Sequence, residues 1–113
     1  MAARLSAANN FARVVALIIS IFEMRIARRF VISGRVQGVG FRYFVHDAAT
    51  REGVAGWVTN LLDGRVEAFV EGEQDAVVRI ERALRKGPSL ARVEHVTIVD
   101  EDATGNLKGF SIR

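Results

Sequence analysis

From Arg28 onward the apolar pattern changes its period about every 10 to 15 residues, and this restricts the possible folds most. Apolar and polar side chains alternate over residues 28–36, which predicts a half-buried strand. A glycine-rich turn follows at residues 37–40. Apolar residues then recur at helical spacing over residues 41–49, and Gly53 stands where that helix would end.

The same signals return in the second half of the chain. Asp63-Gly64 predicts a tight hairpin turn, and Val66, Ala68 and Val70 should share one face of the strand that follows. Asp75 is placed to cap a second helix, which closes at Gly87-Pro88. The strands after the first helix are expected, in chain order, at residues 54–61, 65–71, 93–99 and 109–112.

This order predicts an α+β domain with the ferredoxin-like split βαβ sandwich, βαββαβ plus a short final strand. In that arrangement an antiparallel sheet carries both helices on one face. A chain of 113 residues suits one such domain, which we expect at residues 25–113. The fold alone does not identify a function.

Residues 1–24 are expected to be an N-terminal extension. Their apolar run, VVALIISIF at residues 14–22, is too short for a helix that spans a bilayer, which needs about 20 residues. It has the length of a signal-peptide core, but no small-x-small cleavage pattern follows it. Either an amphipathic or disordered extension or sequence upstream of a true start at Met24 would explain it. We favour the second, because a self-sufficient domain begins just after Met24.

The composition narrows the chemistry. The absence of cysteine excludes disulfides, thiolate zinc sites and a cysteine nucleophile. His46 and His95 are the only histidines and are expected to be ordinary surface or hydrogen-bonded residues, so we expect no metal centre. The acidic run at residues 100–102 is interpreted as a solvated turn. The net charge of +3 is spread along the chain, unlike the dense basic cluster of a nucleic-acid surface.

One loop combines three features that favour anion binding. Glycines at positions 34, 38 and 40 let successive backbone N–H groups converge, and the helix start adds free N–H groups and partial positive charge. Arg42 adds a planar fork of donors. Together they predict a phosphate cradle, with a plain glycine-rich turn as the alternative. A Walker-type loop is excluded because no Gly-Lys-Ser or Gly-Lys-Thr ends it, and the glycine spacing does not fit a dinucleotide fingerprint.

A second candidate lies just before the hairpin turn, in the segment Gly56-Trp57-Val58-Thr59-Asn60. An Asn in this position is most often a turn residue bonded to its own backbone. Its alternative role is to hold a water molecule in line with a phosphate, as donor and acceptor. Trp57 is expected to pack in the core.

Together these two segments resemble the acylphosphatase family. Residues 34–42 fit its Gly-x-Val-Gln-Gly-Val-x-Phe-Arg loop at every specified position. Its second signature is matched by Gly56, Trp57, Val58, Asn60, Gly64 and Val66. Thr59 departs from it, since the family more often has a basic or long polar residue there.

The resemblance implies hydrolysis of carboxyl-phosphate anhydrides (acyl phosphates) to a carboxylate and inorganic phosphate, with no metal or cofactor. It implies a water positioned by Asn60 and a proton accepted by the bound phosphate itself. The groups implied to bind the phosphoryl oxygens, or a phosphate or sulfate ion, are Arg42 and the backbone N–H groups of Gln37, Gly38, Val39, Gly40 and Phe41. We accordingly expect a cytoplasmic monomer that acts on a small-molecule acyl phosphate and binds neither nucleic acid nor membrane.

Two other functions are weighed against this one. Similar domains occur fused to carbamoyl-transfer machinery, so the chain could be a non-catalytic phosphate- or carbamoyl-phosphate-binding module that acts with a separate protein. The presence of both Arg42 and Asn60 favours activity. An RNA-binding domain of this fold would need exposed aromatics on its central strands, where the third strand offers only Phe69.

Overall fold

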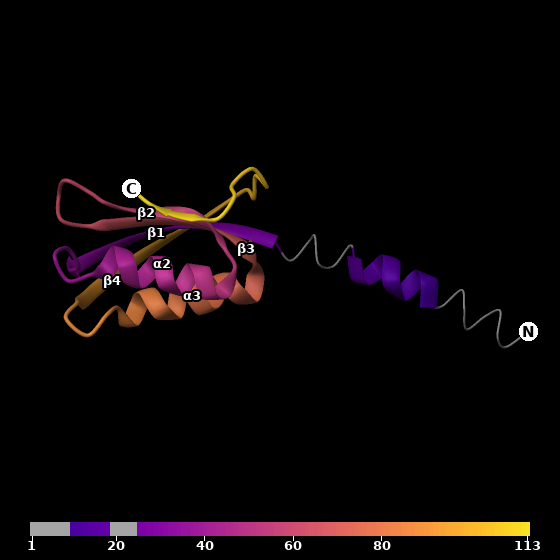
Figure 1. Cartoon of the computed structure of the whole chain (residues 1–113), viewed down its shortest axis with the longest axis horizontal. Helices are drawn as coiled ribbons and strands as arrows, with labels where there is room; N and C mark the ends of the chain where they lie inside the picture. Colours follow the sequence, from indigo (N-terminus) through magenta and orange to yellow (C-terminus); the bar gives the residue numbers. More distant parts are fainter. Residues whose placement is uncertain (1–9, 19–24) are drawn as a thin grey trace, which may run out of the picture.

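Two helices cover one face of a five-stranded sheet in the computed structural model, which describes residues 10–18 and 25–113 (Figure 1). The order is that of the predicted ferredoxin-like α+β fold, which is confirmed. In chain order the elements are β1 (Arg25–Arg35), α2 (Phe41–Glu52), β2 (Ala55–Asn60), β3 (Val66–Glu73), α3 (Gln74–Lys86), β4 (Arg92–Glu101) and β5 (Phe110–Ile112).

The strands lie in the order β4-β1-β3-β2-β5, and β1, β2, β3 and β4 pair antiparallel as expected. β5 is the exception, because it pairs parallel with β2, with Gly56 opposite Phe110. The prediction of a wholly antiparallel sheet was therefore wrong at this edge. After β4, at one edge of the sheet, the chain crosses to the other edge and reverses direction. β5 therefore runs in the same direction as β2, its neighbour at that edge.

The predicted helix ends are confirmed, and each strand after the first helix lies within two residues of its predicted bounds. Gly53, whose φ of 68° is left-handed, is the C-cap of α2, and Gly87 is the C-cap of α3. The N-cap of α3 is Glu73, however, and Asp75 lies in the first helical turn, where its negative charge favours the helix dipole. The acidic run is also not a solvated turn throughout, because Asp100 and Glu101 continue β4 and form ion pairs with β1 arginines.

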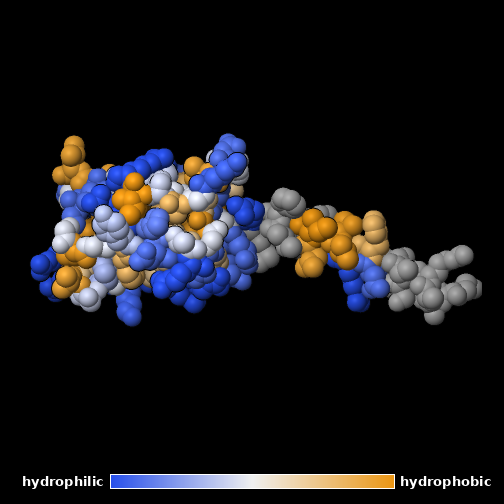
Figure 2. Space-filling model, viewed as in Figure 1, coloured by the Kyte–Doolittle hydropathy of each residue, from blue (hydrophilic) through white to orange (hydrophobic). Residues whose placement is uncertain are grey.

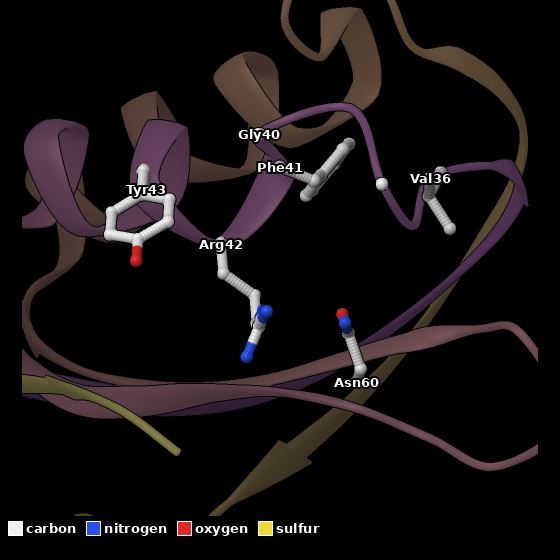
Figure 3. A pocket seen from close by; sticks show the side chains of 7 residues that line it. Val36, Gly40, Phe41, Arg42, Tyr43 and Asn60 are labelled. Carbon is white, nitrogen blue, oxygen red and sulfur yellow. The ribbon is translucent and has the colours of Figure 1, made fainter.

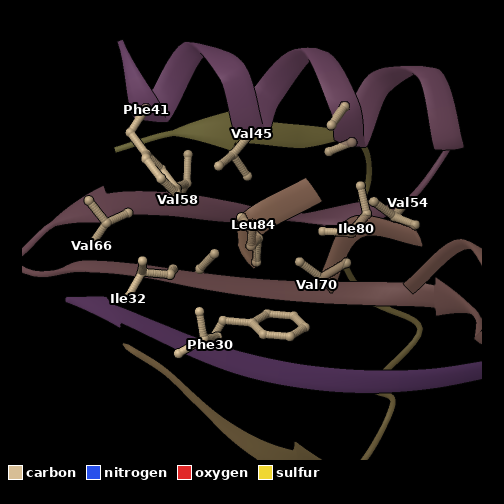
Figure 4. Packing of buried hydrophobic residues seen from close by; sticks show 14 of the residues in the cluster. Phe30, Ile32, Phe41, Val45, Val54, Val58, Val66, Val70, Ile80 and Leu84 are labelled. Carbon is tan, nitrogen blue, oxygen red and sulfur yellow. The ribbon is translucent and has the colours of Figure 1, made fainter. Parts of the chain in front are cut away.

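The core lies between the helices and the face of the sheet that they cover (Figure 4). Val66, Ala68 and Val70 are all fully buried on that face, as predicted. Each fully buried side chain of the size of valine or larger contributes about 1.5–3 kcal/mol. The fully buried side chains shown in the figure include Phe30, Ile32, Val45, Val58, Ile80 and Leu84.

Trp57 does not pack in this core. Its neighbours Gly56 and Val58 are buried, whereas Trp57 is half-buried and stacks on Phe69 with ring centroids 6.3 Å apart. The guanidinium of Arg29 lies 5.5 Å and that of Arg113 4.6 Å from the Trp57 ring. The strand alternation explains the wrong prediction, since successive side chains point to opposite faces and Trp57 falls on the one without helices.

The N-terminal extension is described only over residues 10–18, which are helical, and Figure 2 shows apolar side chains exposed on this segment. The expectations for residues 1–9 and 19–24 lie outside the described residues. No helix in the described ranges is long and apolar enough to span a membrane.

Candidate active site

The glycine-rich loop connects β1 to the start of α2. Gly38 and Gly40 have φ angles of 71° and 77°, a left-handed conformation that other residues rarely adopt. Gly40 is the N-cap of α2 and supplies no side chain to bond the free N–H groups of the first turn. That first turn also contains no acidic residue. The positive end of α2 is therefore open to an anion.

The first glycine of the motif has a different role. Gly34 has a φ of 123° and lies at an irregularity in the pairing of β1 with β4. A Cβ atom there would collide with the backbone oxygen of Arg92. Gly34 thus allows the two strands to approach closely just before the loop, and it does not line the pocket.

The two segments singled out in the sequence meet at one pocket of about 190 Å³. Arg42 enters it from α2 and Asn60 from β2, and their side chains reach into the same space (Figure 3). Of the other residues expected to bind phosphate, Gly38, Gly40 and Phe41 line the pocket. Gln37 and Val39 do not. The lining also includes Val36 and Tyr43, which the sequence did not indicate.

Arg42 and Asn60 both have unused hydrogen-bonding capacity. In the part of the chain that the structure describes, no carboxylate pairs with Arg42, and its one side-chain hydrogen bond is donated by Nη1 to the backbone oxygen of Arg113 at 3.4 Å. Asn60 Oδ1 is buried and accepts no hydrogen bond from the described groups. Leaving such an acceptor unpaired costs about 1–3 kcal/mol, so the pocket suits a ligand that can donate to it.

Side-chain hydrogen bonds attach the β2–β3 hairpin, which carries Asn60, to the glycine-rich loop and also stabilise the turn of the hairpin. Gln37 Nε2 donates to the backbone oxygens of Leu61 at 2.7 Å and Arg65 at 2.9 Å. In the turn, Asp63 accepts from the backbone N–H and the guanidinium of Arg65 at 3.1 and 2.8 Å. The hydrogen bond from the Arg65 guanidinium holds the pKa of Asp63 below its ordinary value.

The histidines lie outside the pocket. His46 is partly exposed, with its ring against the edge of Phe110, and His95 is exposed on β4. Within residues 10–18 and 25–113, no three His, Asp or Glu side chains gather as metal ligands would. The pocket instead offers the cation of Arg42, the free N–H groups at the start of α2 and the side-chain amide of Asn60. This set of groups can bind a phosphoryl group and a water molecule.

The comparisons with known proteins agree with this geometry. The family model described as acylphosphatase matches residues 28–112, nearly the whole of the domain. The chain belongs to the acylphosphatase family. Membership makes it an enzyme of the acylphosphatase class, a hydrolase.

Individual relatives cover the same part of the chain. An acylphosphatase of Anaeromyxobacter dehalogenans is 52% identical over 89 residues, which are 79% of this chain and 96% of the relative. The crystal structure of the Bacillus subtilis acylphosphatase is similar with a TM-score of 0.75 and 38% identity, covering 78% of this chain and 98% of that one. Full-length HypF in its phosphate- and nucleotide-bound form has a TM-score of 0.70 and 29% identity, over 79% of this chain but only 12% of HypF.

Proposed function

We propose that the pocket of this acylphosphatase-family chain hydrolyses acyl phosphates by holding the phosphoryl group on the loop and Arg42, with the water on Asn60. One observation carries the proposal: Arg42, which has no carboxylate partner among residues 10–18 and 25–113, lines the same small pocket as the buried Asn60 Oδ1, which has no donor there. The first suits phosphoryl oxygens, and the second suits a water hydrogen.

In the proposed reaction the water oxygen attacks phosphorus and the bond from phosphorus to the acyl oxygen breaks. The carboxylate leaves with that bonding pair, and inorganic phosphate remains. Arg42 and the N–H groups at the start of α2 stabilise the negative charge on the phosphoryl oxygens during the displacement. Asn60 Oδ1 accepts one hydrogen bond from the water and directs a lone pair of its oxygen toward phosphorus.

The water must also lose a proton, and the described residues that line the pocket include no carboxylate and no histidine. We therefore assign the proton to an oxygen of the transferring phosphoryl group. A carboxylate is a good leaving group, so that positioning and charge stabilisation can supply most of the rate enhancement without a strong protein base.

The experiment is hydrolysis of a simple aryl acyl phosphate in the presence of a chelator. We expect turnover by the wild-type chain and its loss in Arg42→Ala and Asn60→Ala. Phosphate should inhibit the wild-type chain competitively. Asn60→Ala should still bind phosphate, whereas Arg42→Ala should bind it poorly. Arg82→Ala on α3 and Asn106→Ala, both at exposed positions, are the matched controls and should behave as wild type. An inactive wild-type chain, or full activity in either pocket variant, would refute the proposal.

The likeness to part of HypF is the observation behind a second and less favoured candidate, a phosphate- or carbamoyl-phosphate-binding module that acts with a separate protein. A similar domain there forms a small part of a much larger chain. The same experiment separates the two functions. A non-catalytic module would bind phosphate through Arg42 in an equilibrium titration and would hydrolyse no acyl phosphate, with Asn60→Ala indistinguishable from wild type.

A further inference from the structure

We propose that the side chain of Gln37 is a positioning residue, which sets the spacing between the phosphate loop and Asn60. The proposal rests on the function proposed above, because spacing matters only if one side holds the phosphoryl group and the other the water. It assigns the Gln37 side chain a role separate from that of the N–H groups of the loop.

The hydrogen bonds of Gln37 cross from the loop to the hairpin. Nε2 donates to Leu61 O at 2.7 Å and to Arg65 O at 2.9 Å, which uses both of its hydrogens. Both acceptors are carbonyl oxygens, so only the nitrogen end of the amide can face them. Leu61 N also donates to Arg65 O at 2.8 Å, so the amide binds where the two strands of the hairpin are themselves joined.

This attachment point is next to the catalytic amide, because Leu61 directly follows Asn60 in the chain. The Gln37 side chain is not among the groups that line the pocket. It points from the loop to the hairpin and leaves the open end of α2 to the anion. A ligand role for this side chain is therefore not supported, and a bridging role is.

The sheet does not provide such a bridge. The loop follows β1 and Asn60 ends β2, but β3 lies between these two strands. Across the described residues, no other hydrogen bond joins residues 36–40 to the β2–β3 hairpin. Without the hydrogen bonds of Gln37, only β3 and side-chain packing would fix the position of the loop relative to Asn60. Misplacement of reacting groups by about 1 Å can cost on the order of 100-fold in rate.

The test measures kcat, KM and inhibition by phosphate in Gln37→Met, which keeps the shape and removes both hydrogen bonds. We expect kcat to fall about 10- to 100-fold while the phosphate inhibition constant changes less than about threefold, because Arg42 and the loop N–H groups remain. Combined with Asn60→Ala, the same substitution should lower the residual kcat by less than about threefold, since no water is then held. Gln74→Met, at an exposed position at the start of α3, is the control and should leave all three constants unchanged.

A second variant keeps the proposal testable if Gln37→Met loses its fold, as checked by thermal unfolding. Gln37→Glu places a carboxylate against two carbonyl oxygens, and protonation restores one donor. The two facing carbonyl oxygens disfavour the charged carboxylate and raise its pKa above the ordinary glutamate value of about 4.3. The kcat of this variant relative to wild type should therefore rise as pH falls through that raised pKa. A pH-independent ratio would contradict the bridging role.

Three further outcomes would overturn the proposal while leaving the proposed function intact. These are an unchanged kcat in Gln37→Met, a loss confined to phosphate binding, and losses that multiply in the double variant with Asn60→Ala. If the wild-type chain shows no turnover, the proposed function fails, and the positioning role fails with it.

Discussion

At the scale of single residues, Asn60 combines a structural cost with the role proposed for it in holding the water. Its Oδ1 is buried without a donor among the described groups, although the strand around it is regular. An unpaired buried acceptor is destabilising, and such groups are concentrated at sites where a ligand completes the hydrogen bonding. We interpret Asn60 as a position where stability is lost in favour of activity.

This interpretation predicts the effect of Asn60→Leu, which keeps a similar shape and removes the polar atoms. The free energy of unfolding should rise by about 1 kcal/mol, because the unpaired oxygen is gone, while acyl phosphate hydrolysis is lost. Urea unfolding and a turnover assay measure the two effects. Lower stability together with lost turnover would contradict the interpretation, since Asn60 would then be a structural residue as well.

The residues of the site differ in how far the sequence could predict them. The start of α2, with Gly40 and Arg42, was predictable because its features are adjacent in the chain. Asn60 as a pocket residue came from the family resemblance, since an Asn beside a turn is usually explained by the turn itself. The bonds from Gln37 to Leu61 and Arg65 span 24 and 28 residues, and no local pattern indicates them.

At the scale of elements, periodicity predicted the helices and strands but not every partner. β1 to β4 follow from alternation and from the hairpin turn. β5 has only three residues, too few for a pattern to specify its partner or direction. Its parallel pairing with β2 depends on the path of the chain after β4, which the sequence does not encode locally. The outward position of Trp57 could have been inferred from the alternation of its own strand.

The segment before β5 is held by a carboxylate buried in the sheet. Glu71 of β3 is fully buried and accepts hydrogen bonds from the backbone N–H groups of Thr104 and Gly105. These bonds attach the connection between β4 and β5 to the centre of the sheet. They also help to set the position of β5. Arg113 directly follows β5, and its backbone oxygen accepts the hydrogen bond from Arg42.

Glu71 substitutions should therefore weaken the fold in a graded way. Glu71→Ala leaves two backbone N–H groups without acceptors and should lower the free energy of unfolding by on the order of 3 kcal/mol. Glu71→Gln keeps one acceptor oxygen and should cost about half as much. Glu67→Ala, at a partly exposed position of the same strand, is the control and should cost less than about 1 kcal/mol. Equal losses at positions 71 and 67 in urea unfolding would contradict this assignment.

At the scale of the whole molecule, the site is assembled from segments far apart in the chain. The loop after β1, the start of α2, the end of β2 and the residue after β5 come together at one end of the sheet. All of these parts lie within residues 25–113. None of the side chains lining the pocket comes from residues 10–18.

The N-terminal extension should therefore be dispensable for folding and turnover. The family model begins at residue 28, and the Anaeromyxobacter relative is covered almost completely by 79% of this chain. In the described part of the extension, Phe11 is 73% exposed, and Val14, Val15 and Ile18 are exposed as well. Residues with so little burial contribute little to the free energy of unfolding.

We expect a chain that starts at Met24 to match the full chain in urea unfolding and in kcat/KM for an aryl acyl phosphate, within about twofold. Removal of the exposed apolar residues should also reduce self-association, which light scattering measures. A deletion through Arg29 is the contrasting variant. It removes the first part of β1 with the buried Ala27 and the ion pair of Arg29 with Glu101, so that it should unfold at much lower urea concentration. If the Met24 chain lost stability or turnover, the extension would belong to the working enzyme, and the domain boundary at residue 25 would be wrong.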